Sequence, residues 1–578
     1  MEQTLTLPTR PGRPFIGESF DLKTWDDAKP LYDNLLNRPI HNADELRRWL
    51  ADRSELESYL SENFAWRYIR MTCNTSDEEL INRLNFFITE IQPPMAVYGN
   101  ELDKKAVESP WLGELRDPGF GITVRGMKKG IEIFREENIP LQTEMQTEER
   151  KYGAIAGAMT VEIRGEEMTL QRASDLLQNT DRAVREDAWR KIQDRRYRDK
   201  DQLDALYSHL RDLRHRIAVN AGFANFRDYA FAALGRFDYT PEDCFNFHAS
   251  VSKAVVPLLD RLAEERKEKL GVDPLRPWDT KVDPDGRAAL KPFQSGTELL
   301  DKTIDCFTRL DPFLGECLRI MKAMGHVDLE SRKGKAPGGY NYPLEEIGVP
   351  FIFMNATSSL RDLVTMVHEG GHAVHSFLTR DLPLKSFRNP PMEVAELASM
   401  SMELLSMDYW DSFFENPDDL KRAKIQHLES IVETLPWVAT IDKFQHWVYE
   451  NATHTVDERR QTWVRIYEEF TDRVTSWEGL DRYEEYLWQK QLHLYEVPFY
   501  YIEYGIAQLG AIGIWMNFRQ DRQKGLQGYF NALKLGYMAP ITDIYRAADV
   551  PFDFSQENIG RLIRFVWEEI ESLKNGGR

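Results

Sequence analysis

Hydrophobic residues recur at intervals of three and four along most of the chain, with charged residues between them. This spacing puts apolar side chains on one face of an α-helix, so it predicts a mainly α-helical fold, most clearly over residues 183–214. The apolar positions there are Val184, Trp189, Ile192, Leu203, Leu206 and Leu210. Strand signals are few: residues 158–163 and 168–170, joined by a turn at Gly165, predict a hairpin, and residues 349–354 predict a further strand.

A chain of 578 residues is long for one ordinary compact core, so two or more lobes around one cleft are expected. The hairpin and the helices after it put the division between lobes near residue 200, although no repeat or flexible linker marks it. A Gly/Pro-rich loop at residues 334–343 leads into the strand at 349–354 and then into a helix. We expect loop, strand and helix to form one functional unit beside a small sheet.

Composition and charge exclude several classes of function. The chain is 42% hydrophobic and 29% charged, which is typical of a folded soluble protein. Its net charge of −20 argues against a nucleic-acid or anionic-membrane partner, because both require a cationic face. The longest apolar run, residues 505–515, is too short to span a bilayer, and the first residues lack the pattern of a secretion signal.

The cysteines indicate a reducing compartment. They form no C-x-x-C pair, which predicts free thiols rather than a disulfide framework or a thiolate zinc site. We therefore expect a cytoplasmic protein. The four cysteines are Cys73, Cys244, Cys306 and Cys317.

The candidate chemistry lies on a helix predicted over residues 359–377, with Ser359 or one of the two residues before it as N-cap. His368 and His372 are four residues apart, so both imidazoles face the same side of that helix and can bind one ion. Zinc in hydrolases takes three protein ligands and a water, and Glu369 is placed to accept the proton of that metal-activated water. The pattern predicts a metal-dependent hydrolase.

Two features of this helix need explanation. Gly370 and Gly371 each cost about 1 kcal/mol relative to alanine in a helix, so we expect tight packing there against the helix that carries the third ligand. His375 continues the stripe three residues after His372, and we interpret it as a residue behind the ligands rather than as a ligand.

The third ligand is expected on a following helix. A metzincin would need glycine and histidine where His375 and Leu378 stand, so that class is excluded. Residues 390–403 predict a helix that starts at a proline and carries three acids on one face. Spacing alone leaves all three open and favours the second. They are Glu393, Glu396 and Glu403.

Residues 359–407 resemble the thimet-oligopeptidase-like zinc peptidases, and more specifically their oligoendopeptidase F group. The group's signature is H-E-x-G-H-x-x-H followed by a glutamate on the next helix, and this chain has Gly370 where the family usually has a bulky residue. The resemblance implies that Glu396 is the third zinc ligand and that Glu403 lies close behind the ligands.

The resemblance extends to both sides of the motif. Upstream, residues 338–340 and 350–355 are similar to the family's glycine loop and to the strand along which substrate lies, which implies substrate contacts at Gly339, Tyr340 and Phe353. Downstream, residues 493–504 are similar to the segment whose histidine and tyrosines face the zinc. The implied catalytic residues in that segment are Tyr504 and His493, and the implied substrate contacts are Tyr500 and Tyr501.

Together these features predict a mainly α, two-lobed helical bowl around a deep cleft, with an N-terminal lobe at residues 1–200 and a catalytic domain at 201–578. The predicted activity is that of a zinc-dependent oligoendopeptidase, with one zinc per chain, which hydrolyses internal bonds of short unstructured peptides. Glu369 acts as general base, and Tyr504 with His493 stabilises the oxyanion. A carboxypeptidase or dipeptidyl carboxypeptidase on the same scaffold, and a silent peptide-binding protein, are the alternatives. The oligomeric state stays open.

Overall fold

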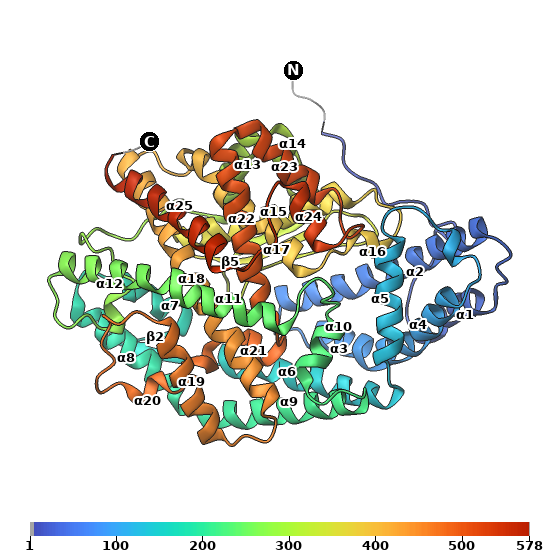
Figure 1. Ribbon diagram of the computed structural model, residues 1–578, viewed down its shortest axis with the longest axis horizontal. Helices are drawn as coiled ribbons and strands as arrows, with labels where there is room; N and C mark the ends of the chain where they lie inside the picture. Colours follow the sequence, from blue (N-terminus) through green and yellow to red (C-terminus); the bar gives the residue numbers. More distant parts are fainter. Residues whose placement is uncertain (1–4, 577–578) are drawn as a thin grey trace.

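The computed structural model describes residues 5–576 and is mainly α-helical, as the sequence predicts (Figure 1). The first helices are α1 (Trp25–Asn37), α2 (Ala43–Cys73), α3 (Glu78–Phe86), α4 (Gln92–Val107), α5 (Phe120–Ile133) and α6 (Ile139–Gly157). The next are α7 (Leu170–Asp175), α8 (Arg182–Arg198), α9 (Lys200–Asn220), α10 (Phe226–Ala233), α11 (Pro241–Ala254), α12 (Val256–Leu270), α13 (Gly296–Leu310) and α14 (Pro312–Met324). The last are α15 (Leu360–Thr379), α16 (Lys385–Arg388), α17 (Met392–Ser406), α18 (Pro417–Glu450), α19 (Val456–Phe470), α20 (Asp481–Glu484), α21 (Leu492–Glu496), α22 (Tyr501–Gln520), α23 (Arg522–Leu533), α24 (Ile541–Ala547) and α25 (Gln556–Lys574).

The two largest hydrophobic cores organise most of these helices. The first is built mainly by α1, α2 and α4, which lie together at one end of the molecule (Figure 1), and Leu384 and Phe387 from the α16 region complete it. The second and larger core extends from Leu141 to Leu573 and includes the helices around the predicted site. The predicted lobe boundary near residue 200 stays a prediction.

The amphipathic stretch at 183–214 is two helices rather than one. α8 ends at Arg198 and α9 begins at Lys200, and the backbone of Asp199 between them (φ −95°, ψ 4°) departs from helical geometry. The hydrophobic period continues across this break, which is why the pattern alone does not reveal it. Among residues 5–576, no helix combines the length and the apolar character that a membrane span requires.

The strands form two small sheets. The predicted hairpin is confirmed as β1 (Thr160–Ile163) and β2 (Glu166–Thr169). A three-stranded sheet has the order β3-β5-β4, with β3 (Val327–Glu330) parallel and β4 (Tyr340–Tyr342) antiparallel to β5 (Phe351–Ala356). The end of the predicted Gly/Pro loop is therefore itself a strand, and β5 confirms the strand predicted near residues 349–354.

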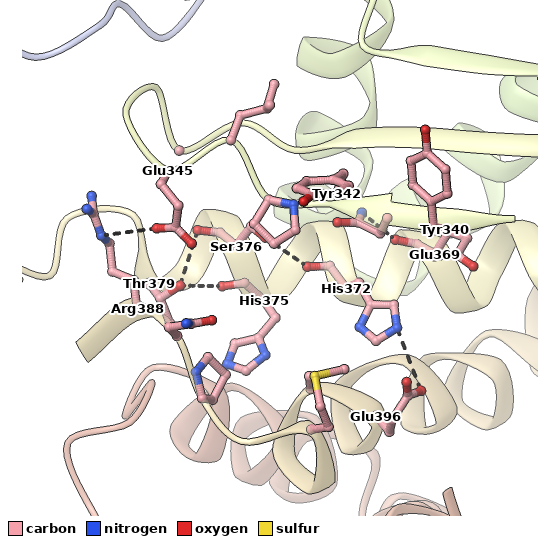
Figure 2. A pocket seen from close by; sticks show the side chains of 18 of the residues that line it. Tyr340, Tyr342, Glu345, Glu369, His372, His375, Ser376, Thr379, Arg388 and Glu396 are labelled. Carbon is pink, nitrogen blue, oxygen red and sulfur yellow. Dashed lines mark hydrogen bonds and ion pairs between the residues drawn. The ribbon is translucent and has the colours of Figure 1, made fainter. Parts of the chain in front are cut away.

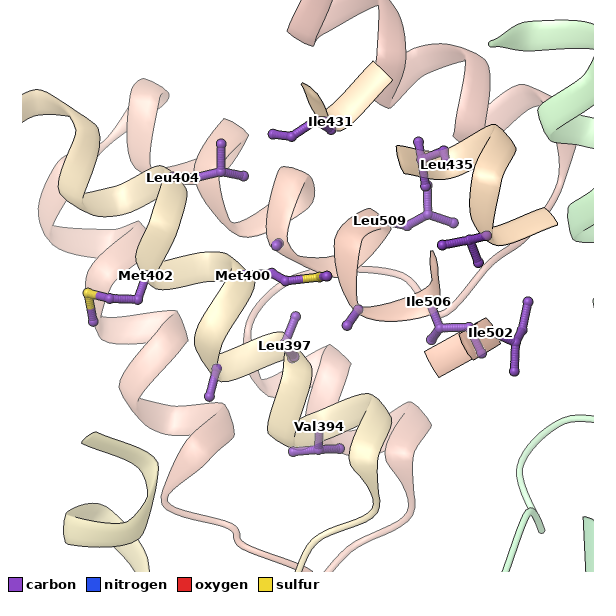
Figure 3. Close-up of a cluster of buried hydrophobic side chains, with 14 of the residues drawn as sticks. Val394, Leu397, Met400, Met402, Leu404, Ile431, Leu435, Ile502, Ile506 and Leu509 are labelled. Atoms are coloured by element: carbon purple, nitrogen blue, oxygen red, sulfur yellow. The ribbon is translucent and has the colours of Figure 1, made fainter. Parts of the chain in front are cut away.

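The core that supports the site is formed by three helices. Apolar side chains of α17, α18 and α22 lie in one buried cluster, in which α22 contacts both other helices (Figure 3). α22 contains the apolar run at residues 505–515, which is buried as expected from the sequence. The residues labelled in the figure are Val394, Leu397, Met400, Met402, Leu404, Ile431, Leu435, Ile502, Ile506 and Leu509. Because these side chains are buried, the helices that carry the polar site have fixed relative positions.

Candidate active site

Helix α15 carries the predicted motif, and its start is fixed by a capping box. The Ser359 hydroxyl accepts a hydrogen bond from the Asp362 backbone N–H, and the Asp362 carboxylate accepts one from the Ser359 N–H. The predicted helix and its N-cap are thus confirmed. Figure 2 shows how its next turns present Glu369, His372 and His375 beside a cavity.

The two glycines of the motif allow neighbouring helices to approach closely. A Cβ on Gly371 would lie 2.6 Å from Ser399 Cα and 2.7 Å from the Ala398 carbonyl oxygen, so only glycine permits this contact between α15 and α17. The predicted close packing is confirmed at Gly371, against α17, which carries the candidate third ligand Glu396. At Gly370 the neighbour is different, because a Cβ would lie 2.8 Å from the ring of Phe307 in α13.

His368, His372 and Glu396 converge at one point. One ligand atom from each lies within 4.8 Å of the other two. Glu396 Oε2 is 3.3 Å from His368 Nε2 and 3.7 Å from His372 Nε2. A tetrahedral zinc ion has ligand atoms about 3.3–3.5 Å apart, given bonds of roughly 2.0–2.1 Å to nitrogen and oxygen. The donor set and its spacing therefore fit zinc.

The other two glutamates of α17 face different partners. Glu403 Oε1 lies 2.6 Å from His368 Nδ1, so this carboxylate orients the ring and leaves Nε2 directed at the candidate metal position. Glu393 is buried and accepts a hydrogen bond of 2.5 Å from the Tyr239 hydroxyl. Spacing alone does not distinguish the three glutamates of α17, but their different partners in the structure do.

The surroundings shift the pKa values of these groups in opposite directions. Burial raises the pKa of the Glu369 carboxyl to about 7. Burial also opposes ionisation of Glu396, but His372, His368 and a tyrosine hydroxyl outweigh it and lower that pKa to about 2. For His372, burial lowers the pKa to about 4, so the imidazole is neutral near pH 7 and its ring nitrogen is free to bind a metal.

A cavity of about 460 Å³ opens over this cluster (Figure 2). Its lining includes most of the predicted site residues: Gly339, Tyr340, His368, Glu369, His372, His375, Glu396, Tyr500 and Tyr504. Helix α2, in the N-terminal part of the chain, contributes Ser61, so the lining residues extend in sequence from Ser61 to Tyr504. Phe353, Glu403, His493 and Tyr501 are not among the lining residues.

The sheet contributes to the cavity through β4 rather than β5. β5 lies between β3 and β4, and both of its edges are paired at Ile352 and Phe353. Substrate therefore cannot pair with that part of residues 350–355, and β4 is the edge strand next to the cavity. Phe353 is fully buried and stacks on Tyr340 with ring centroids 4.8 Å apart, so it supports that tyrosine instead of contacting substrate.

The first turn of α22 and the residue before it bring tyrosines to the cluster. The Tyr500 hydroxyl donates a hydrogen bond of 2.7 Å to Glu396 Oε1, so this side chain holds the carboxylate whose other oxygen faces the histidines. The Tyr504 hydroxyl is 3.3 Å from His493 Nε2. Tyr501 packs against both His493 and Tyr504, with ring centroids 5.0 and 5.3 Å away, and lies outside the cavity lining.

A chain of hydrogen bonds determines which way the Tyr504 hydroxyl donates. Trp437 Nε1 donates to Gln491 Oε1 at 3.1 Å, which leaves the Gln491 amide nitrogen to donate to His493 Nδ1 at 2.7 Å. Burial lowers the pKa of His493 to about 4, so its neutral ring carries the proton on Nε2 and donates it to the Tyr504 oxygen. The Tyr504 O–H is left free to donate into the cavity.

His375 is buried and lines the cavity beside His372. It is not part of the group whose ligand atoms converge, and its Nε2 has no hydrogen-bond partner within residues 5–576. Burial lowers its pKa to about 3, so the ring is neutral near pH 7.

Sequence reasoning missed three residues of this site. Trp437 and Gln491 orient His493, and His427 Nε2 lies 3.6 Å from Glu403 Oε2, behind the carboxylate that contacts His368. None belongs to a local motif, because α18 carries both Trp437 and His427 to the site from far along the chain. Only the position of Gln491, two residues before His493, gives a signal in the sequence.

Comparisons with known proteins identify the family to which the chain is related. A family model described as Peptidase family M3 matches residues 175–303 and 316–559, and one described as Peptidase M3 N-terminal domain matches residues 18–134. Over 415 residues the chain is 23% identical to an oligoendopeptidase F homolog of Lactococcus lactis, a match that covers 69% of this chain and 67% of the relative. Over 389 residues it is 22% identical to oligopeptidase PepF of Bacillus subtilis, covering 65% and 57%. A solved structure of PZ peptidase A with inhibitor 2 superimposes with a TM-score of 0.90 at 26% identity, covering 96% of this chain and 99% of that one.

Proposed function

Because the chain belongs to peptidase family M3, we propose that it is a zinc-dependent oligoendopeptidase whose zinc is held by His368, His372 and Glu396. The observation that carries the proposal is the convergence of these three ligand atoms within 4.8 Å beside Glu369, in one cavity. When bound there, zinc supplies Lewis-acid polarisation of the scissile carbonyl and acidifies the attacking water.

The protein's own groups perform the remaining steps. Glu369 accepts the proton of the attacking water and later delivers it to the leaving amine. The Tyr504 hydroxyl donates a hydrogen bond to the oxyanion as it develops, and His493 keeps that hydroxyl in the donating orientation. Tyr500 and Glu403 hold Glu396 and His368 in place through hydrogen bonds of 2.7 and 2.6 Å.

The substrate is a short, extended peptide. β4 presents a strand edge beside the cavity, and main-chain hydrogen bonds to such an edge bind any sequence in an extended conformation. A cavity of about 460 Å³ admits a few residues of an extended chain and excludes a folded domain. We therefore propose broad side-chain tolerance and a preference for unstructured oligopeptides, cleaved in the cytoplasm.

The assignment of the base and the third ligand is tested by two variants. Glu369→Gln is expected to keep bound zinc and lose turnover, because the amide cannot accept the proton. Glu396→Ala is expected to lose zinc affinity, since only two imidazoles then face the ion. Zinc content by plasma mass spectrometry and turnover of a quenched peptide separate the two effects. Normal zinc content in Glu396→Ala would refute the ligand assignment.

One observation favours release of C-terminal fragments as a second activity. Arg380, Lys385 and Arg388 line one part of the same cavity, where Arg388 Nε lies 3.9 Å from Glu345 Oε2 (Figure 2). Cationic groups at this position can bind the free carboxylate of a substrate. Matched peptides with a free and an amidated C-terminus test this: a carboxylate-dependent enzyme cleaves only the first, whereas an endopeptidase cleaves both.

A further inference from the structure

We propose that Cys244, Asp442 and His446 form a second metal site, which holds a zinc ion in the core between α11 and α18. One ligand atom from each of the three lies within 4.8 Å of the other two, and all three side chains are buried, at 1%, 0% and 1% exposure. Sulfur, carboxylate oxygen and imidazole nitrogen are a donor set that suits zinc. None of these residues belongs to the cluster around Glu369.

The helices place these side chains by the same spacing that builds the first site. Cys244 and His248 lie four residues apart on α11, and Asp442 and His446 lie four residues apart on α18. Residues four apart share a helix face, so each helix directs two polar side chains toward the other helix. His248 Nε2 is 2.8 Å from Asp442 Oδ2, which places His248 as the outer partner that orients the carboxylate.

Several polar atoms of this cluster have no other partner. Asp442 Oδ1 and His446 Nδ1 lack a hydrogen-bond partner within residues 5–576 although both are buried, and His446 Nε2 lies 3.3 Å from Asp442 Oδ2 without the geometry of a hydrogen bond. Such atoms destabilise a fold unless something satisfies them. The distance of 3.3 Å between His446 Nε2 and Asp442 Oδ2 matches two ligands of one ion, because ligand atoms around a tetrahedral zinc lie about 3.3–3.5 Å apart.

The charge balance also favours a cation. Within residues 5–576 the ion pairs of Asp442 are to His248 and His446, with no lysine or arginine among them. A divalent cation neutralises the buried carboxylate together with a Cys244 thiolate. Zinc that binds Cys244 replaces the thiol proton, which leaves to solvent.

A metal ion at the second site would stabilise the turn at Phe499, which precedes Tyr500 and α22. The side chain of Gln445, next to His446, accepts a hydrogen bond of 2.6 Å from the Phe499 N–H, and the His446 ring lies 5.4 Å from the Phe499 ring. Phe499 has a left-handed backbone (φ 67°), a conformation that its surroundings must hold. Because Tyr500 and α22 follow directly, an ion between α11 and α18 stabilises the turn that positions Tyr504.

Cobalt in place of zinc gives a direct test, because cobalt bound to a thiolate shows a charge-transfer band in the near ultraviolet. The first site contains no sulfur, so such a band reports on Cys244. The full-length chain is expressed with cobalt in a Cys73→Ser background, since Cys73 is the partly exposed thiol. We expect two metal ions per chain and the band. Cys244→Ser should lose the band and one ion, whereas Cys306→Ser, a change at another fully buried thiol, should lose neither.

One metal ion per chain without the band would overturn the proposal, and so would a band that survives in Cys244→Ser. The cluster would then be a hydrogen-bonded core network of His248, Asp442 and His446. If Cys244→Ser does not fold, the spectrum and metal content of the Cys73→Ser protein, in which Cys244 is intact, still test the proposal. A Glu396→Ala variant that keeps the band and one ion shows that this site is independent of the first. A failure of the second-site proposal can therefore be told apart from a failure of the proposed function.

Discussion

Tyr504→Phe removes the hydroxyl that the structure directs into the cavity. The hydrogen bonds from Trp437 to Gln491, from Gln491 to His493 and from His493 to the Tyr504 oxygen leave the Tyr504 O–H free to donate. Loss of one oxyanion donor costs about 10²–10³ in kcat. The oxyanion develops only in the transition state, so we expect KM to change little. Zinc content should be normal, because Tyr500 rather than Tyr504 contacts the proposed ligand Glu396.

The assay is steady-state hydrolysis of an internally quenched peptide, with bound zinc measured on the same samples. Tyr409→Phe is the matched control, because it makes the same change at a side chain outside the cavity lining. It should leave kcat unchanged. A wild-type kcat in Tyr504→Phe would remove this hydroxyl from the mechanism.

A second variant tests whether the hydrogen-bond chain matters. Gln491→Leu removes the donor to His493 Nδ1, so the His493 ring can place its proton on either nitrogen and accept from Tyr504 instead. We expect a lower kcat in the single variant and no further loss when it is combined with Tyr504→Phe. Losses that multiply in the double variant would show that Gln491 does not act through Tyr504.

Two further predictions concern the support of the site. Glu403→Ala removes the 2.6 Å partner of His368 Nδ1 and should weaken zinc affinity about 10–100-fold, as measured by competition with a chelator; unchanged affinity would contradict a role in orienting the ring. Gly371→Ala should lower the free energy of unfolding by about 1–3 kcal/mol in a denaturant titration, because its Cβ would lie 2.6 Å from Ser399 Cα. Gly99→Ala, in an open position of α4, should instead raise it by about 1 kcal/mol, and equal effects at both glycines would refute the packing argument.

The parts of the site that the sequence predicts are those encoded locally. His368, Glu369 and His372 lie within five residues on one helix, so the period of an α-helix alone brings them together. The capping residue Ser359 and the close contact at Gly371 follow from equally local features. The third ligand is intermediate, because spacing allows three glutamates and only resemblance singles out Glu396.

The parts that the sequence does not predict depend on packing between distant segments. α18 carries Trp437 and His427 to the active site and Asp442 to the second cluster, and no motif announces any of these positions. The order of the strands also depends on contacts between separate segments. The pattern of residues 349–354 identifies a strand, but it does not show that this strand lies between β3 and β4 in the sheet. The chemical groups of the site are therefore easier to predict from sequence than the strand edge that lies beside the cavity.

The most direct measurement combines bound-metal analysis of the purified protein with mass-spectrometric mapping of cuts in unstructured peptides of graded length, with and without a chelator. We expect bound zinc, cuts at internal bonds, loss of cleavage with chelator, and an upper limit on peptide length set by the cavity. Cleavage that persists after complete removal of metal from His368, His372 and Glu396, or bound zinc without any cleavage, would contradict a zinc oligoendopeptidase.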